Sequence, residues 1–165
     1  MAPKTQPTPE SSTQQQFISF LLNQGIWGMI PTTQLTETIN LELGTIVQIP
    51  DLPPAVIGVC SWRGEVLWLV DLSYALGLPH LLSTDYQSAK CNVLKVTVNQ
   101  QSFGILVAEV RQLVKCDRHK IKTGIPSSLT LDAVRLVEGY YTPTPDISIL
   151  SVDLGGLLEN LRSPT

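Results

Sequence analysis

Short apolar runs separated by polar turns make up most of the chain, and one pair of runs is especially informative. Val56–Cys60 and Val66–Val70 flank a polar break that contains Arg63 and Gly64. Short runs rich in β-branched and aromatic residues, on either side of a turn that contains glycine, are typical of a β-hairpin. The pattern therefore predicts a buried hairpin with Arg63 at its tip, next to Trp62.

The hairpin tip has two interpretations. A guanidinium on a rigid turn beside an indole is well placed to meet a partner's carboxylate or backbone carbonyls. The alternative is that Arg63 is a solvated turn residue and that Trp62 only packs. The local sequence by itself leaves both interpretations open.

The arrangement of strands and turns occurs twice along the chain. An offset of 76 residues aligns Leu22–Gly28 with Val98–Gly104, including an Asn-Gln pair, an aromatic residue and a glycine. An offset of 82 residues aligns Val70–Leu72 with Val152–Leu154, both of which are Val-Asp-Leu. A repeat of this size indicates a domain-scale duplication into two lobes. The drift between the two offsets predicts an insertion around residues 122–131.

Each lobe is expected to contain about five short strands, and Gly58 aligns with Gly139 in the last hairpin of each. Several short strands with regular turn signals favour a small closed or partly closed barrel, and two such barrels side by side would leave a groove. The expected strands are Phe17–Leu22, Met29–Ile30, Ile46–Ile49, Ile57–Trp62 and Val66–Val70 in the first lobe, and Val93–Val98, Ile105–Val107, Val110–Val114, Leu136–Tyr141 and Ile147–Val152 in the second.

A short helix is predicted after each lobe. Asp71 and Asp153 each end an expected strand, and an aspartate in that position can accept hydrogen bonds from the first backbone N–H groups of a helix. The first helix would end at Gly77, whereas the second has leucines spaced i, i+3, i+4 and i+7 from Leu154 to Leu161. We therefore interpret both aspartates as helix N-caps and not as catalytic groups.

These boundaries predict the domain organisation. Residues 1–16 are mostly Pro, Thr, Ser and Gln, with almost nothing to bury, and are expected to be a disordered tail. The ordered domain is expected at 17–162, with one lobe at about 17–80 and the other at about 90–162. An exchange of elements between the two lobes is left open.

Composition restricts the possible classes of function. The chain is 43% hydrophobic and 15% charged, and its net charge of −3 argues against nucleic acid as the main partner. The densest basic stretch, residues 115–122, is interpreted as a solvated loop. No apolar run approaches the ~20 residues of a membrane span, and the N-terminus has no signal-peptide pattern, so we expect a cytoplasmic protein without direct membrane insertion.

The residue types that support catalysis are scarce, so we expect no enzyme, no cofactor and no metal. Phosphate-loop, metalloprotease and nucleophile-elbow motifs are absent from the sequence. Glu65 and Asp71 are six residues apart on one strand, roughly 20 Å, which is too far for an acid–base pair. His80 and His119 are expected to be surface residues. The alternative, an enzyme that uses Asp71 or His119, is kept open.

The three cysteines have a structural interpretation. Cys60, Cys91 and Cys116 are odd in number and widely spaced, which fits neither a disulfide framework nor a zinc site. We expect them to be small, reduced core residues.

At this point the chain shows a resemblance to a known family. Residues 53–72 resemble the signature hairpin of CheW-like domains, and weaker similarity over 17–29 and 92–114 extends the resemblance to about 17–162. The residues that fall on signature positions are Gly58, Arg63, Gly64, Asp71 and Leu72.

This resemblance implies a fold and a function. CheW-like proteins consist of two five-stranded SH3-like barrels, and they couple chemoreceptor tips to a CheA-type histidine kinase without catalysing a reaction. One barrel is expected to bind the regulatory domain of the kinase, and the groove between the barrels is expected to meet the receptor. Recruitment to membrane receptor arrays is compatible with this role. The residues expected in protein contacts are Arg63, Trp62, Gly58, Gly64, Leu35, Glu37 and Trp68.

The chain also departs from the family pattern. Ser61, Trp62 and Trp68 replace the usual Asn, Leu and Pro, and residues 140–145 replace a glycine-rich segment. Such changes are compatible with a paralogue that serves motility or light sensing, such as a type IV pilus or phototaxis adaptor. A small-molecule-binding regulator that uses the groove between the barrels is the alternative function.

Overall fold

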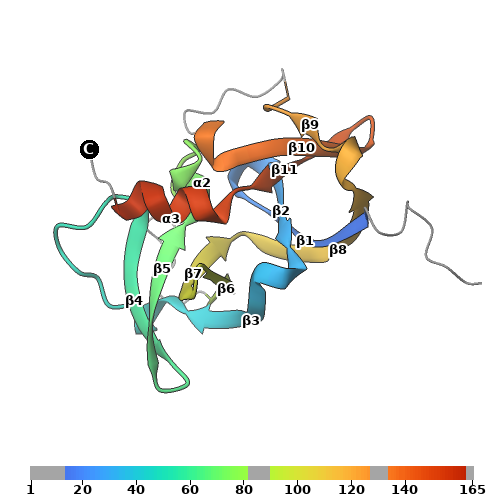
Figure 1. Ribbon diagram of the computed structural model, residues 1–165. Helices are drawn as coiled ribbons and strands as arrows, with labels where there is room; N and C mark the ends of the chain where they lie inside the picture. The colour runs from blue at the N-terminus through green and yellow to red at the C-terminus, as the bar shows by residue number, and fades with distance from the viewer. Residues whose placement is uncertain (1–13, 82–89, 127–133, 163–165) are drawn as a thin grey trace, which may run out of the picture.

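The structure, a computed structural model, describes residues 14–81, 90–126 and 134–162 (Figure 1). Two sheets curl into SH3-like barrels, which confirms the prediction of a mainly β protein with two such lobes. The strands and α-helices are β1 (Gln14–Leu21), β2 (Trp27–Pro31), β3 (Leu35–Glu42), β4 (Val56–Trp62), β5 (Glu65–Asp71), α2 (Leu72–Ala75), β6 (Lys90–Val98), β7 (Gln101–Val107), β8 (Glu109–Asp117), β9 (Lys122–Thr123), β10 (Val137–Thr144), β11 (Ile147–Val152) and α3 (Leu154–Arg162).

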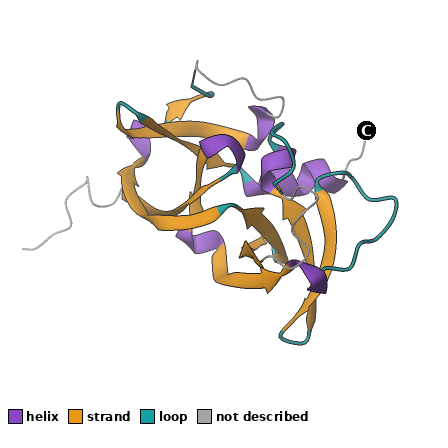
Figure 2. Cartoon of the chain, turned by 180° about the vertical axis from the view of Figure 1, so that it is seen from behind, coloured by secondary structure: helices purple, strands orange, loops and turns teal. Residues whose placement is uncertain are grey.

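The two lobes have matching strand orders. The sheet that we call the first lobe has the order β3-β6-β7-β5-β4, and the second lobe has the order β8-β1-β2-β11-β10-β9. Strand β9 has only two residues, and its counterpart in the first lobe is a single bridge between Val47 and Val59. Each lobe is therefore five longer strands plus one short pairing, and strands dominate both lobes (Figure 2).

The two halves of the chain exchange their opening hairpins. Hairpin β1–β2, from the N-terminal half, lies in the second lobe, and hairpin β6–β7, from the C-terminal half, lies in the first. Parallel pairings connect the exchanged hairpins, with Leu69 opposite Gly104 and Leu150 opposite Gly28. Each lobe therefore needs strands from both halves.

The exchange explains why some strands are apolar on both faces. In β6, Val93 faces the core of the first lobe, whereas Leu94 and Val96 face the core between the lobes. A strand that is covered on both sides gives a nearly continuous apolar run instead of strict alternation. Lys95 interrupts this run, and its charge is paired with Glu65.

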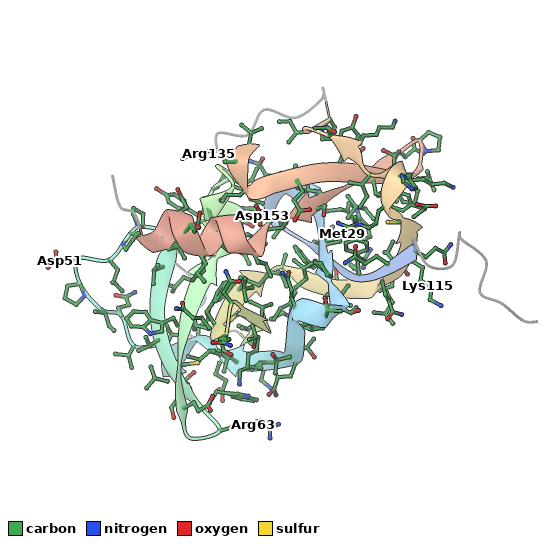
Figure 3. All side chains as sticks on the ribbon, viewed as in Figure 1. Met29, Asp51, Arg63, Lys115, Arg135 and Asp153 are labelled. Atoms are coloured by element: carbon green, nitrogen blue, oxygen red, sulfur yellow. The ribbon has the colours of Figure 1, made fainter. Side chains whose placement is uncertain are left out.

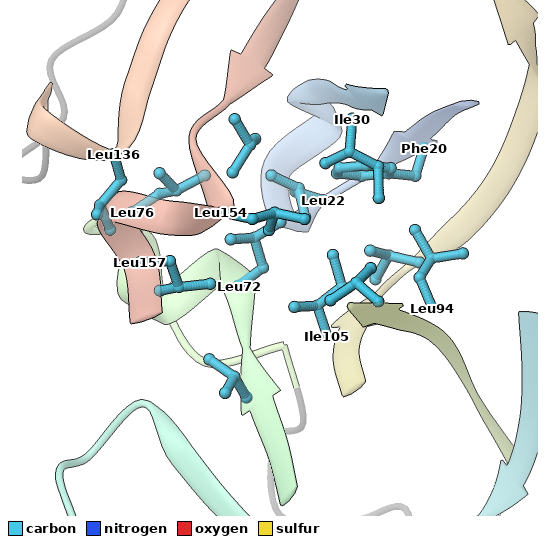
Figure 4. Packing of buried hydrophobic residues seen from close by; sticks show 14 of the residues in the cluster. Phe20, Leu22, Ile30, Leu72, Leu76, Leu94, Ile105, Leu136, Leu154 and Leu157 are labelled. Atoms are coloured by element: carbon cyan, nitrogen blue, oxygen red, sulfur yellow. The ribbon is translucent and has the colours of Figure 1, made fainter. Parts of the chain in front are cut away.

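The core has three parts. The largest cluster lies between the lobes (Figure 4) and includes Phe20, Leu72, Leu94, Ile105 and Leu157, which are all fully buried. Each lobe also has a smaller interior cluster. The first-lobe cluster consists of Ile39, Leu41, Cys60, Leu67, Leu69, Cys91, Val93 and Leu106, and the second-lobe cluster consists of Phe17, Met29, Cys116 and Ile149.

Two glycines show that the halves are built alike. A Cβ at Gly58 would lie 2.2 Å from the carbonyl oxygen of Val47, and a Cβ at Gly139 would lie 2.2 Å from that of Lys122. The strand register shifts at both glycines, so each occupies the same irregularity in its hairpin. The aligned glycines therefore permit the same close backbone crossing in both lobes.

Both aspartates after the closing strands are helix caps, as predicted. Asp71 Oδ1 accepts a hydrogen bond from Tyr74 N at 3.2 Å, and Asp153 Oδ1 accepts one from Gly156 N at 3.1 Å. Each aspartate also donates its own N–H to the carbonyl oxygen of the residue just before the first strand of its hairpin, Ala55 before β4 or Leu136 before β10. The first helix is only four residues long, whereas the second has nine.

The third strand of the first lobe was placed wrongly by the sequence pattern. Residues 46–49 form only the Val47 bridge, and the strand is β3, which pairs with β6. β3 alternates buried or half-buried residues with exposed ones, and several of its polar positions are Thr, Glu and Asn. Of the apolar residues in 46–49, Val47 and Ile49 are exposed, and only Ile46 packs against the first-lobe cluster.

The start of the ordered chain also differs from the prediction. β1 begins at Gln14, so the last three residues of the expected tail belong to a strand. Gln14–Gln16 are ordered because they pair with β8 through their backbones. Pairing of this kind does not depend on side-chain polarity. The rest of the tail, and residues 127–131 of the expected insertion at 122–131, lie outside the described residues.

Candidate protein-binding surface

The tip of hairpin β4–β5 is a two-residue turn that presents Arg63. Arg63 and Gly64 both have positive φ angles, 52° and 81°. Two central residues with positive φ match the right-handed twist of the flanking strands, which is why such turns close tight hairpins. The turn projects the Arg63 side chain, which is 70% exposed, away from the first lobe (Figure 3).

Arg63 is oriented by two neighbours. Its Nε lies 3.4 Å from Glu37 Oε2, and its guanidinium carbon lies 5.5 Å from the ring centroid of Trp62. Glu37 is on β3, at the opposite edge of the same sheet, so the ion pair spans the open end of the barrel. An exposed pair of this kind contributes only about 0–1 kcal/mol, and Nε is one of five guanidinium donors.

A second ion pair lies at the same end of the barrel. Lys95 Nζ is 3.6 Å from Glu65 Oε1, and the Lys95 side chain is only 13% exposed. In the register of β3 and β6, Lys95 is opposite Glu37. Glu37, Arg63, Glu65 and Lys95 therefore form a cluster of alternating charges beside the hairpin tip. Lys95 and Glu65 were not among the predicted contacts, although a lysine within the apolar run of β6 was a usable signal.

Trp62 occupies a different position from the one expected for an exposed anchor. Its ring is half-buried and packs against the core of the first lobe. Its Nε1 atom is buried and has no hydrogen-bond partner among the described residues. Trp62 therefore packs against the core of the first lobe, as the alternative interpretation predicted. A contact between Trp62 and a partner stays a prediction.

Trp68, by contrast, lies on the outer face of the hairpin. Trp68 is 43% exposed and Val66 is 69% exposed, and both alternate with the buried Leu67 and Leu69 of β5. Across the hairpin, Trp68 is opposite Val59. We call this apolar surface the hairpin outer face; it consists of Val47, Val59, Val66 and Trp68.

A shallow apolar groove adjoins the hairpin outer face. Its volume is about 390 Å³, and it runs from Trp68 to the last turns of α3. None of its lining residues is charged; they are Leu52, Pro53, Val56, Trp68, Val70, Gln101, Ser102, Phe103, Leu158 and Leu161. A surface of this composition is suited to apolar side chains of a partner.

The other predicted contact residues, Gly58, Gly64 and Leu35, offer little side-chain surface to a partner. Gly58 permits the crossing at Val47 and has no side chain to offer, whereas a Cβ at Gly64 would meet nothing within 4 Å. Leu35 packs against the core between the lobes. A register shift separates Leu35 from Glu37, so the structure brings Glu37 to Arg63 but places Leu35 toward the other lobe.

The titratable residues offer no metal-binding arrangement in the part of the chain that the structure describes. No group of three or more His, Cys, Asp or Glu side chains there could hold a metal ion. His80 is 49% exposed, as expected for the surface, but its Nδ1 is also 3.5 Å from Asp71 Oδ2. Its ring stacks on Tyr74 at 3.9 Å. Helix α2 and the turn after it fold the chain back, so that His80 comes close to Asp71 although they lie nine positions apart in the sequence.

The three cysteines are buried and free, as core residues. Burial raises the pKa of each thiol above its ordinary value of 9.0. For Cys91, burial followed by the nearby Cys60 raises the pKa to about 11. Thiols of this kind are poor nucleophiles at neutral pH.

These features define a class: a double-barrel β protein with exchanged hairpins, whose exposed apolar and charged surface is suited to protein contacts. The chain belongs to the CheW-like domain family, since the family model matches residues 16–162. Among solved structures, it is similar to the scaffolding protein TtCheW from Thermoanaerobacter tengcongensis, with 21% identity and a TM-score of 0.67. The alignment covers 84% of this chain and 88% of that one, and it shows a shared fold.

No curated protein matches the chain. None of the helices within the described ranges is long and apolar enough to cross a bilayer.

Proposed function

We propose that the chain is a non-catalytic adaptor that couples chemoreceptor-type, methyl-accepting proteins to a CheA-type histidine kinase. The observation that supports this most is membership of the CheW-like family over nearly the whole described chain. The similar structure is described as a scaffolding protein. A cytoplasmic location, and an output in chemotaxis, twitching or phototaxis, belong to the same proposal.

The surface at the first lobe suits the kinase contact. The hairpin outer face and its groove can accept apolar side chains, while Arg63 at the rim supplies a directional charged contact. Interfaces commonly combine such an apolar centre with a polar rim. Weak individual contacts of this size gain strength when adaptor, kinase and receptor assemble in arrays.

The test is direct binding to the purified regulatory domain of a CheA-type kinase from the same genome. We expect saturable binding by the unmodified chain and an affinity at least about tenfold lower for Arg63→Glu, because reversal of a rim charge opposes the partner's carboxylate. Lys90→Glu is the matched control, since Lys90 is an exposed cation on β6 of the same lobe. Equal losses of affinity in both variants would show that Arg63 is not a specific part of the interface. Absence of binding by the unmodified chain would refute the kinase contact.

The groove also supports a second candidate, a small-molecule-binding regulator. Its volume of about 390 Å³ falls in the range of small-ligand pockets, and such pockets are mostly apolar. A saturable thermal shift with a metabolite, abolished by Trp68→Ala, is the expected result for this candidate. An adaptor is expected to shift only with a protein partner.

A further inference from the structure

A second charged surface, which the proposed function does not use, lies on the second lobe. We call it the basic turn; it consists of Lys115, Arg118, His119, Lys120 and Lys122. These residues lie at the end of β8, in the 3-10 turn Arg118–Lys120 and on β9, and all five are exposed. Lys115 lies on a different side of the molecule from Arg63 (Figure 3).

One acidic side chain outside the basic turn interacts with it: burial and then Asp153 raise the pKa of Glu138, and Arg118 opposes this rise. The salt bridges found among the described residues involve Arg63, His80, Lys95 and Arg111, and none involves a basic-turn residue. The acid within the turn, Asp117, accepts a hydrogen bond from the backbone of His119 at 3.0 Å, so it caps the turn.

The charge of this region is opposite to that of the rest of the chain. Residues 109–126 contain five basic and two acidic residues, a net charge of +3, whereas the whole chain carries −3, so the remainder carries −6. An extended polyanion, such as a nucleic acid or an anionic membrane, would meet the negative remainder as well. A short acidic segment would meet only the basic turn, because charges beyond about 8 Å are largely screened at physiological salt.

The basic side chains are not needed to hold the turn. Backbone groups close it, with Ile121 N donating to Arg118 O at 3.2 Å. Asp117 pairs with β1 through the backbone. Lys122 contacts a ring, its Nζ lying 5.8 Å from the centroid of Tyr140, whereas Arg118 and Lys120 are both exposed.

We propose that the basic turn is a docking site for a short acidic, carboxylate-rich segment of a protein partner. Exposed lysine and arginine side chains on a rigid turn can each pair with a carboxylate, and the opposite charge accelerates association. The proposal does not depend on Arg63 or on the kinase contact, because the surface lies on the other lobe.

The experiment measures binding of the full chain to a fluorescein-labelled peptide of alternating Glu and Gly residues by fluorescence anisotropy, at low and at physiological ionic strength. The test variant is Arg118→Gln/Lys120→Gln. The control variant is Lys90→Gln/Arg135→Gln, which removes the same charge from two exposed positions outside the basic turn. Circular dichroism confirms that both variants are folded.

The proposal predicts that the unmodified chain binds the peptide, that affinity falls as salt rises, and that the test variant binds about tenfold more weakly. The control variant should change affinity less than about twofold. Absence of peptide binding, or equal losses in the two variants, would overturn the proposal. Stronger binding to phosphatidylserine vesicles or to a single-stranded oligonucleotide than to the peptide would also overturn it, in favour of that class of ligand. A kinase-binding failure would leave these results unaffected.

Discussion

Gly58→Ala should destabilise the protein far more than Gly64→Ala, although the two glycines lie on the same hairpin. Gly58 has a φ angle of +154°, and a Cβ there would lie 2.2 Å from the carbonyl oxygen of Val47. Gly64 has a φ angle of +81° but meets nothing within 4 Å. The pair therefore separates a steric clash from backbone strain alone.

The cost can be worked from the atoms involved. Because Val47 O must move by about 1 Å, the two hydrogen bonds between Val47 and Val59, 2.8 and 2.9 Å long, should weaken or break. Two backbone hydrogen bonds contribute about 1–3 kcal/mol, and the unfavourable φ angle adds about 1–3 kcal/mol. We expect a loss of about 3–5 kcal/mol for Gly58→Ala and about 1–2 kcal/mol for Gly64→Ala.

Urea denaturation followed by circular dichroism measures both losses, and thermal melting gives a second estimate. For a chain of this size, each kcal/mol lowers Tm by about 2–4 °C, so Gly58→Ala should melt at least about 2 °C below Gly64→Ala. If the two variants have the same stability, the close crossing at Val47 does not constrain Gly58. Gly58 would then have to be explained by contact with a partner.

Three further outcomes follow from the site. Trp62→Phe should change the free energy of unfolding by less than about 1 kcal/mol, because it removes a buried N–H that has no partner among the described residues; a loss above about 3 kcal/mol in urea denaturation would contradict this. Trp68→Ala should cost less stability than Leu69→Ala, for which we expect about 2–5 kcal/mol, since Trp68 is 43% exposed and Leu69 is fully buried; equal losses would place Trp68 in the core. The Cys91 pKa is raised from 9.0 to about 11 in the folded state, so unfolding releases a proton between these values, and the contribution of Cys91 to stability should be complete below pH 9 and fall as the pH rises toward 11. Urea titrations of Cys91→Ala across this range should show a weaker decline, and an unchanged decline would refute the assignment.

Local patterns were sufficient where a residue's neighbours in the chain are also its neighbours in space. Hairpin β4–β5, with Arg63 at its tip, follows from two apolar runs and a glycine turn, since a tight turn pairs adjacent strands. The caps at Asp71 and Asp153 follow for the same reason, because an aspartate caps a helix that starts at the next residue. The repeat of these signals indicated two lobes.

The candidate surface was less predictable because distant strands build it. Glu37 meets Arg63 only because β3 and β4 are the two edges of one curled sheet. Lys95 reaches the same cluster of charges through the exchange of hairpin β6–β7 into the first lobe. Trp62 is half-buried and Trp68 is exposed because only one face of the hairpin covers the core of the first lobe.

The sequence alone determined the strand-and-turn units, their duplication and the position of Arg63, because these depend on interactions between residues close together in the chain. Only the tertiary structure decided which hairpin completes which lobe and which side chains share a surface. Both sheets require long-range pairings, such as β5 with β7 and β2 with β11. Those pairings bury the core between the lobes and leave the hairpin outer face and the basic turn exposed to solvent.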